Sequence, residues 1–180
     1  QSTLLVMANR IDDLAPQLAA LLEKDKAALP GNLMHLNRML ARHTDKQAVQ
    51  KLVDRVAAPY ENVPEAHFAM AQAAANAGDN LRALAETERA LALRPDWEAA
   101  ALARAQLQAG RSSATAIDSL NDFVSRNPGA RDAHLTLARL LISERRYDES
   151  RKQFDRLILD NPDNPEVIYP VAMLALQQGD

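Results

Sequence analysis

The 180-residue sequence contains no cysteine, and aromatic residues make up only 4% of it. The absence of cysteine excludes disulfides, thiolate metal sites and a cysteine nucleophile, although it does not identify a cellular compartment. Because the chain is nevertheless 47% hydrophobic, its core must be built mainly from alanine and leucine. These two residues favour helices, whereas β-branched and aromatic residues favour strands. The composition therefore predicts an all-α fold.

Long apolar segments and an excess of positive charge are also missing. No apolar run approaches the roughly 20 residues of a membrane-spanning helix, so direct membrane insertion is not expected. The net charge is −3, whereas nucleic-acid-binding surfaces are normally basic, so no nucleic-acid partner is expected. The chain begins at Gln1 without a basic-then-apolar leader, and a leader would therefore lie outside this sequence.

Proline and glycine recur at a regular interval. Three prolines follow helix-like runs at spacings of 33 and 34 residues: Pro95, Pro128 and Pro162. Three of the five glycines each close an apolar segment: Gly78, Gly110 and Gly179. Proline cannot continue a helix and glycine accepts the left-handed conformation that ends one, so both act as stop signals. The chain is therefore read as a series of repeats.

Between these stop signals, apolar residues are spaced by three and four positions, as in Ala133, Leu137, Leu140 and Leu141. Each period thus contains two helices of about a dozen residues. We expect helix pairs at 64–78 with 80–93, 96–109 with 114–126 and 131–144 with 147–160, then a final first helix at 166–178.

Residues 1–60 follow the same pattern less clearly. Leu33, Leu36 and Leu40 predict one helix, Leu52 and Val56 predict another, and the turn falls at 43–45. Before this pair, Asp12 or Asp13 is a candidate helix cap, with Pro16 in the first turn. Residues 1–60 are interpreted as degenerate repeats continuous with an array at 61–180; a separate helical cap is the alternative.

The segment from Arg145 to Ser150, followed by Phe154 and Pro162, resembles the second half of a tetratricopeptide repeat. The segment Gly78-Asp79 does so too, since it is followed by small residues at the positions where the family's helices touch: Ala83 and Ala90. The resemblance covers residues 64–180. It implies a right-handed superhelical solenoid of antiparallel helix pairs, with about five repeats ending in a half repeat.

In this family the first helices line a concave wall that binds a protein or peptide partner. The resemblance places a set of residues on that wall: Arg38, Phe68, Gln72, Trp97, Arg104, Leu135, Arg139, Tyr169 and Met173. Arg104 and Arg139 are interpreted as a pair that holds a carboxylate, because guanidinium binds carboxylates bidentately. The alternative is that both pair internally with Glu65, Glu98 or Asp132. Trp97 is either a binding anchor or a wedge between repeats.

No cluster of residues in the sequence indicates chemistry. The four histidines, at 35, 43, 67 and 134, lack metal-ligand spacing, so no metal, cofactor or catalytic residue is predicted. The hypothesis is a non-enzymatic interaction scaffold. Self-assembly through open apolar ends, and a regulatory or docking region of a larger envelope or enzyme complex, are the alternatives. Similarity to multi-repeat proteins of the Gram-negative bacterial envelope favours the periplasm or outer membrane over the cytoplasm.

Overall fold

The computed structural model describes residues 11–24, 28–160, 165 and 167–171. Within these ranges the chain forms α-helices and one 3-10 helix and no strand, which confirms the all-α fold. The chain divides into two compact units, residues 1–95 and residues 96–180. The helix expected at 166–178 lies largely outside the described residues, and so do Met173 and Gly179.

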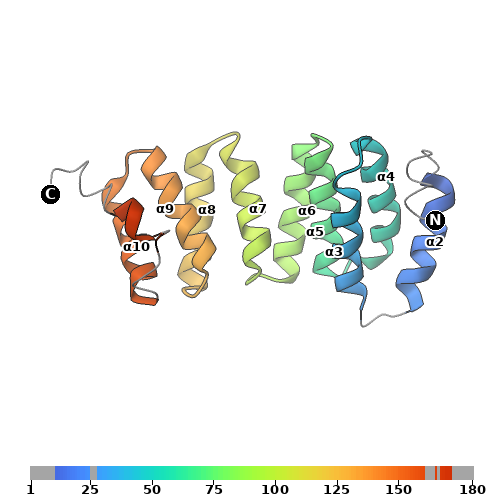
Figure 1. The fold of residues 1–180 in the computed structure, drawn as a ribbon, viewed down its shortest axis with the longest axis horizontal. Coiled ribbons are helices and arrows are strands. Elements are labelled where there is room, and N and C mark those ends of the chain that lie inside the picture. The colour runs from blue at the N-terminus through green and yellow to red at the C-terminus, as the bar shows by residue number, and fades with distance from the viewer. Residues whose placement is uncertain (1–10, 25–27, 161–164, 166, 172–180) are drawn as a thin grey trace. The chain divides into compact units, whose positions relative to one another are not determined.

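The described residues of the first unit form five α-helices and a short 3-10 helix, and Figure 1 shows these α-helices side by side. They are α2 (Ile11–Lys24), α3 (Leu29–Leu40), α4 (Lys46–Ala57), η1 (Ala58–Tyr60), α5 (Pro64–Asn76) and α6 (Asn80–Leu93). Helix α5 packs against α3, α4 and α6, and α2 packs against α4. The core between these helices is aliphatic, and Leu33, Leu52 and Val56 are each at most 2% exposed. Burial of this apolar surface is the main stabilisation of the unit.

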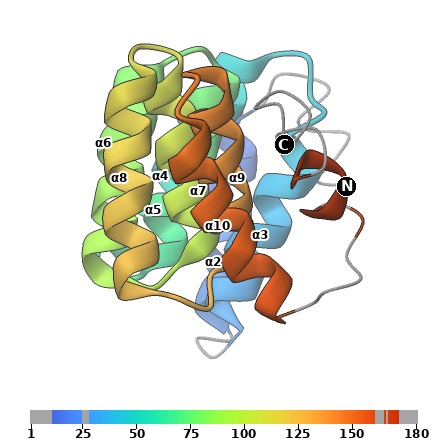
Figure 2. The same ribbon diagram turned by 90° about the vertical axis from the view of Figure 1, so that its left-hand side faces the viewer.

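The described residues of the second unit include two helix pairs. They are α7 (Glu98–Ala109) with α8 (Ser113–Arg126), and α9 (Arg131–Ser143) with α10 (Tyr147–Asp160). Helix α9 contacts both α7 and α8 as well as its own partner α10. In the first unit α5 likewise contacts both α3 and α4. We therefore call α3, α5, α7 and α9 first helices, and α4, α6, α8 and α10 second helices; Figure 2 shows them from a second direction.

Two turns that lie 67 residues apart end their helices in the same way. After α5, Gly78 has φ 84°, and the N–H of Asp79 donates to the carbonyl of Ala74 at 2.9 Å. After α9, Arg145 has φ 59°, and the N–H of Arg146 donates to the carbonyl of Leu141 at 2.8 Å. Both turns have the hydrogen bonds of a Schellman motif, in which one left-handed residue ends the helix. The repeat is thus present in the backbone geometry.

Other helix ends differ from the expectation. Gly110 has φ −62°, so it is not left-handed; two bonds to the carbonyl of Gln108 form the turn instead. Asp12, Asp13 and Pro16 lie inside α2, which corrects the assignment of a cap and a first-turn proline to these residues. Three of the second helices, α4, α6 and α8, have a polar N-cap whose side chain accepts a hydrogen bond from the N–H group three residues later. These N-caps are Asp45, Asp79 and Ser112.

Candidate partner-binding surface

A pocket of about 290 Å³ lies beside α9 in the second unit. We call it the α9 pocket. It is lined by Glu98, Gly129, Arg131, Asp132, Leu135, Leu157 and Val167. Its apolar side chains come from α9, α10 and the helical residues at 167–171, and its charged side chains come from the first turns of α7 and α9. Of these residues, Leu135 was expected on the binding wall, and Glu98 and Asp132 were considered as internal partners of the arginines.

Glu98 contributes to the pocket for a reason that sequence periodicity does not reveal. Its carboxylate Oε1 accepts a hydrogen bond of 2.8 Å from the backbone N–H of Ala133, in the first turn of α9. An acidic side chain at a helix N-terminus satisfies a free N–H group and interacts favourably with the helix dipole. One first helix therefore fixes the start of the next one, and the pocket forms at this junction.

Burial patterns give the register between the first helices of the second unit. Ala100, Ala101 and Ala105 in α7 are buried, and so are the residues 33 positions later, Ala133, His134 and Ala138 in α9. Adding 33 to Gln106 gives Arg139, and both of these side chains are exposed. The equivalent of Arg139 on α7 is therefore Gln106, two residues after Arg104, with which the sequence analysis paired it.

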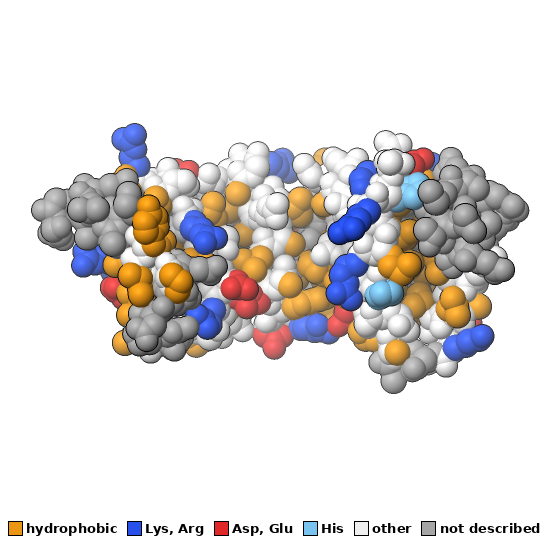
Figure 3. Space-filling model, in the orientation of Figure 1, with side chains coloured by type: hydrophobic (Ala, Val, Ile, Leu, Met, Phe, Trp, Pro, Cys, Tyr) orange, Lys and Arg blue, Asp and Glu red, His pale blue; other side chains and the backbone are white. Residues whose placement is uncertain are grey.

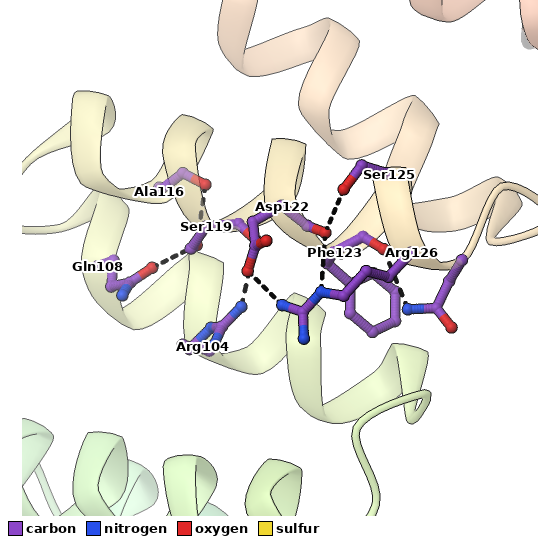
Figure 4. A network of polar contacts seen from close by, with 9 residues as sticks. Arg104, Gln108, Ala116, Ser119, Asp122, Phe123, Ser125 and Arg126 are labelled. Atoms are coloured by element: carbon purple, nitrogen blue, oxygen red, sulfur yellow. Dashed lines mark hydrogen bonds and ion pairs between the residues drawn. The ribbon is translucent and has the colours of Figure 1, made fainter.

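Arg104 consequently lies on a different face of its helix from Arg139. Its Nη2 donates a hydrogen bond of 3.2 Å to the backbone carbonyl of Ser119, on α8. Ser119 Oγ in turn donates to Gln108 Oε1 at 2.6 Å (Figure 4). Arg126 and Asp122, which form an ion pair along α8, complete this network. Arg104 is thus half-buried, and its bond to the backbone carbonyl of Ser119 connects α7 to its second helix.

In the first unit, the predicted wall residues occupy three different environments. Arg38 is exposed on α3. Gln72 is half-buried, and its Oε1 accepts a hydrogen bond of 2.5 Å from Nδ2 of Asn37, which links α5 to α3. Phe68 is only 4% exposed and belongs to the interior of the unit. Arg38 is therefore the predicted wall residue of this unit that is open to solvent.

The two remaining described residues of the predicted wall belong to the second unit. Trp97 is half-buried at the N-terminus of α7, where its carbonyl accepts bonds from the N–H groups of Ala100 and Ala101 at 3.1 Å. Tyr169 is 69% exposed. Met173 lies outside the described residues. We call the surface formed by α9 and residues 167–171 the α9 surface; it combines the α9 pocket with the exposed predicted residues Arg139 and Tyr169.

Two of the histidines perform the same structural role in the two units. His67 Nδ1 lies 2.7 Å from Glu86 Oε2, and its Nε2 lies 2.8 Å from the carbonyl of Glu61. His134 makes the corresponding contacts, to the side chain of Gln153 at 2.7 Å and to the carbonyl of Pro128 at 3.3 Å. Each ring joins a first helix to its second helix, so both side chains are engaged in packing. Among the described residues, no group of three or more His, Asp or Glu could hold a metal ion.

No helix in the described ranges is long and apolar enough to cross a membrane. A comparison with curated protein sequences found no match. The tetratricopeptide repeat family matches residues 111–175, from the start of α8 into the helical residues after α10.

Solved structures share the fold at low sequence identity. TTC0263, a thermophilic TPR protein of Thermus thermophilus, superimposes with a TM-score of 0.63 at 18% identity, covering 97% of this chain and 95% of its own. YrrB, described as a TPR protein with an unusual peptide-binding site, gives 0.61 at 14% identity, covering 94% and 87%. MamA from Desulfovibrio magneticus RS-1 gives 0.63 at 17% identity, covering 84% and 86%. Residues 111–175 are thus similar to tetratricopeptide repeats, and the chain shares the architecture of helix pairs seen in these TPR proteins.

Proposed function

We propose that the chain is a protein-interaction scaffold whose second unit holds a partner segment against the exposed face of α9. The α9 pocket carries this proposal, because it combines three aliphatic side chains with charged ones and lies beside an exposed cation. Leu135 lines the pocket, and Arg139 follows it by four residues, so both lie on one helix face. An aliphatic or aromatic side chain of the partner enters the pocket, while a carboxylate of the partner binds Arg139. A tetratricopeptide fold is suited to this role, since repeat arrays bind partners along extended surfaces.

A random peptide library displayed on phage, selected on the full chain, tests the proposal. Selected peptides are expected to combine an apolar residue with an acidic residue, and their affinity is measured by isothermal titration calorimetry. Leu135→Ala and Arg139→Ala should each weaken binding roughly tenfold, the effect of losing one anchor contact of moderate strength. Arg104→Ala should weaken it less, because that guanidinium bonds to Ser119.

The matched control is Lys152→Ala, which removes an exposed cation from the second helix α10. It should leave the affinity unchanged. Equal binding by wild type, Leu135→Ala and Arg139→Ala would remove the α9 surface as the site. Self-association is the second candidate function, favoured by the exposed side chains of Leu159 and Ile168, 76% and 46% accessible. A mass from light scattering that stays monomeric at all concentrations would exclude it.

A further inference from the structure

Helix α3 carries a row of basic side chains on its solvent face. His35 and Arg38 lie three residues apart on the helix, and Arg42 follows just after its C-terminus. This i, i+3, i+7 spacing places the three on one side of the helix, and all three side chains are exposed. Met39, between the two arginines, is 56% exposed. We call these four residues the α3 stripe. Figure 3 shows basic side chains gathered over this part of the first unit with hydrophobic ones between them.

Buried side chains on the opposite side of α3 fix the orientation in which the α3 stripe faces solvent. Leu33 and Leu40 are buried in the core of the first unit, at 2% and 7% exposure. Asn37 is also buried, and its Nδ2 bonds to Gln72 on α5. The helix therefore cannot rotate without moving apolar side chains into water, which costs about 25 cal/mol for each Å² exposed. The α3 stripe is held outwards by the packing of the rest of the helix.

The positive charge of the α3 stripe is not neutralised within the part of the chain that the structure describes. Elsewhere, five arginines form ion pairs with carboxylates: Arg82, Arg89, Arg94, Arg126 and Arg146. Arg38 and Arg42 form no such pair with a described residue. Helix α3 has no acidic residue, and the next one along the chain, Asp45, accepts a bond from the N–H of Ala48 as the cap of α4.

The local charge balance also differs from that of the whole chain. Residues 28–60 contain five Lys/Arg and two Asp/Glu, although the complete sequence has a net charge of −3. The negative end of the α3 dipole offsets part of the repulsion between Arg38 and Arg42, but it provides no carboxylate for either guanidinium. A partner that brings carboxylates would therefore form charge-assisted bonds that the described part of the chain does not form.

We infer that the α3 stripe binds an acidic peptide segment of a partner protein, with carboxylates on Arg38 and Arg42 and an apolar side chain on Met39. Methionine is flexible and polarisable, so it adapts to different apolar contacts. A nucleic acid is disfavoured because the stripe has no Phe, Tyr or Trp on which bases stack. The inference rests on the proposed function in that α3 is a first helix, but it concerns the first unit alone.

Fluorescence anisotropy with a defined probe tests the inference on the full chain. The probe is a labelled peptide, Asp-Glu-Leu-Glu-Glu-Leu-Asp-Glu, and its neutral counterpart is Asn-Gln-Leu-Gln-Gln-Leu-Asn-Gln. The acidic peptide should bind, the neutral peptide should bind at least tenfold more weakly, and added salt should weaken the acidic peptide further. The double variant Arg38→Glu/Arg42→Glu should reduce affinity for the acidic peptide roughly tenfold or more. Met39→Gln should reduce it to a smaller extent.

The matched control is Lys24→Glu/Lys51→Glu, which makes the same change in net charge at exposed positions of α2 and α4. It should keep most of the affinity, and far-ultraviolet circular dichroism should show unchanged helix content in both double variants. Equal losses in the two double variants, or no binding of the acidic peptide, would overturn the inference. Tighter binding of a single-stranded oligonucleotide or of phosphatidylglycerol vesicles would overturn it as well.

The α9 surface supplies the control that separates this inference from the proposed function. The probe is therefore also measured with Leu135→Ala and Arg139→Ala, which weaken any binding to the second unit. Adding Arg38→Glu/Arg42→Glu to these variants should still reduce the affinity for the acidic probe roughly tenfold. If these variants abolish binding of the acidic probe while Arg38→Glu/Arg42→Glu does not, the probe occupies the α9 surface, and the assignment to α3 fails while the proposed function stands.

Discussion

Burial raises the pKa of the Asp54 carboxyl on α4 above its ordinary value. Arg82 Nη2 lies 2.9 Å from Asp54 Oδ1 and acts in the opposite direction, while the negative charges of Glu86 and Asp79 add to the increase. A carboxyl group whose pKa is higher in the folded chain than in the unfolded chain is destabilising once it ionises. Its favourable contribution is complete below the unfolded pKa and is lost as the pH rises through the folded pKa.

Asp54→Asn should therefore raise the thermal unfolding midpoint at pH 7, because the amide remains neutral where the carboxylate is charged. The gain should shrink as the pH falls and disappear below about pH 3.9, the ordinary pKa of aspartate, where the wild-type carboxyl is also neutral. Circular dichroism melts across this pH range measure the effect. Asp122→Asn, at an exposed site on α8, is the control and should produce no such gain. A lower midpoint for Asp54→Asn at pH 7 would mean that the attraction to Arg82 outweighs burial.

The helices themselves could be predicted from local sequence signals. The expected pair at 131–144 and 147–160 is observed as Arg131–Ser143 and Tyr147–Asp160, and the turn expected at 43–45 separates α3 from α4. These predictions succeeded because stop signals and apolar periodicity act over a few residues. The direction in which each side chain of α7 points could not be predicted as securely. The buried alanines of α7 align Arg139 of α9 with Gln106, two residues after the expected Arg104. Arg104 is turned towards α8.

The α9 pocket could be predicted only in part for a related reason. The position of Leu135 on its helix could be predicted from the apolar periodicity. Leu157 and Val167 belong to other helical segments, and only the packing of those segments brings them to the same pocket. The bond from Ala133 N–H to Glu98 spans 35 residues and has no local signature. Helix-to-helix contacts of this kind depend on distances between axes, which small side chains at the contacts determine.

Ala116 tests how closely α7 and α8 approach. Its side chain is fully buried on α8, whereas Ala114 on the same helix is exposed. Ala116→Leu should lower the free energy of unfolding by about 1–3 kcal/mol, because extra methylene groups in a packed interface force neighbouring side chains apart. Ala114→Leu should change it by less than about 0.5 kcal/mol, since leucine and alanine have similar helix propensity. Urea denaturation measures both variants. Similar losses at the two positions would show that helix propensity, and not packing, limits α8.

At the scale of the whole molecule, the division into two compact units was not apparent from the sequence. The prolines and glycines that end helices recur on both sides of the boundary after Pro95. Each of them depends only on its own turn, so their spacing does not reveal where one unit ends. The two units nevertheless have separate apolar clusters. One includes Leu33 and Val56, and the other includes Ala138 and Phe154. In repeat proteins stability is approximately a sum of unit and neighbour terms, so two clusters of this kind can unfold at different denaturant concentrations.

The substitution His67→Ala tests whether the two units unfold at different denaturant concentrations. It removes the ring that bonds to Glu86 and to the carbonyl of Glu61, and leaves a buried carboxylate with Arg89 as its remaining partner. The loss should be about 2–3 kcal/mol, confined to the first unit. Trp97, the single tryptophan, belongs to the second unit.

In urea, His67→Ala should therefore shift the part of the circular dichroism transition that reports on the first unit to lower urea concentration. The Trp97 fluorescence transition, which reports on the second unit, should keep its midpoint. His134→Ala removes the equivalent ring from the second unit and should move the fluorescence transition instead. Its cost should be smaller, about 1–2 kcal/mol, because the partner side chain of His134 is the neutral amide of Gln153 and no carboxylate is left buried. If each substitution moved both signals by the same amount, the two units would unfold as one cooperative structure.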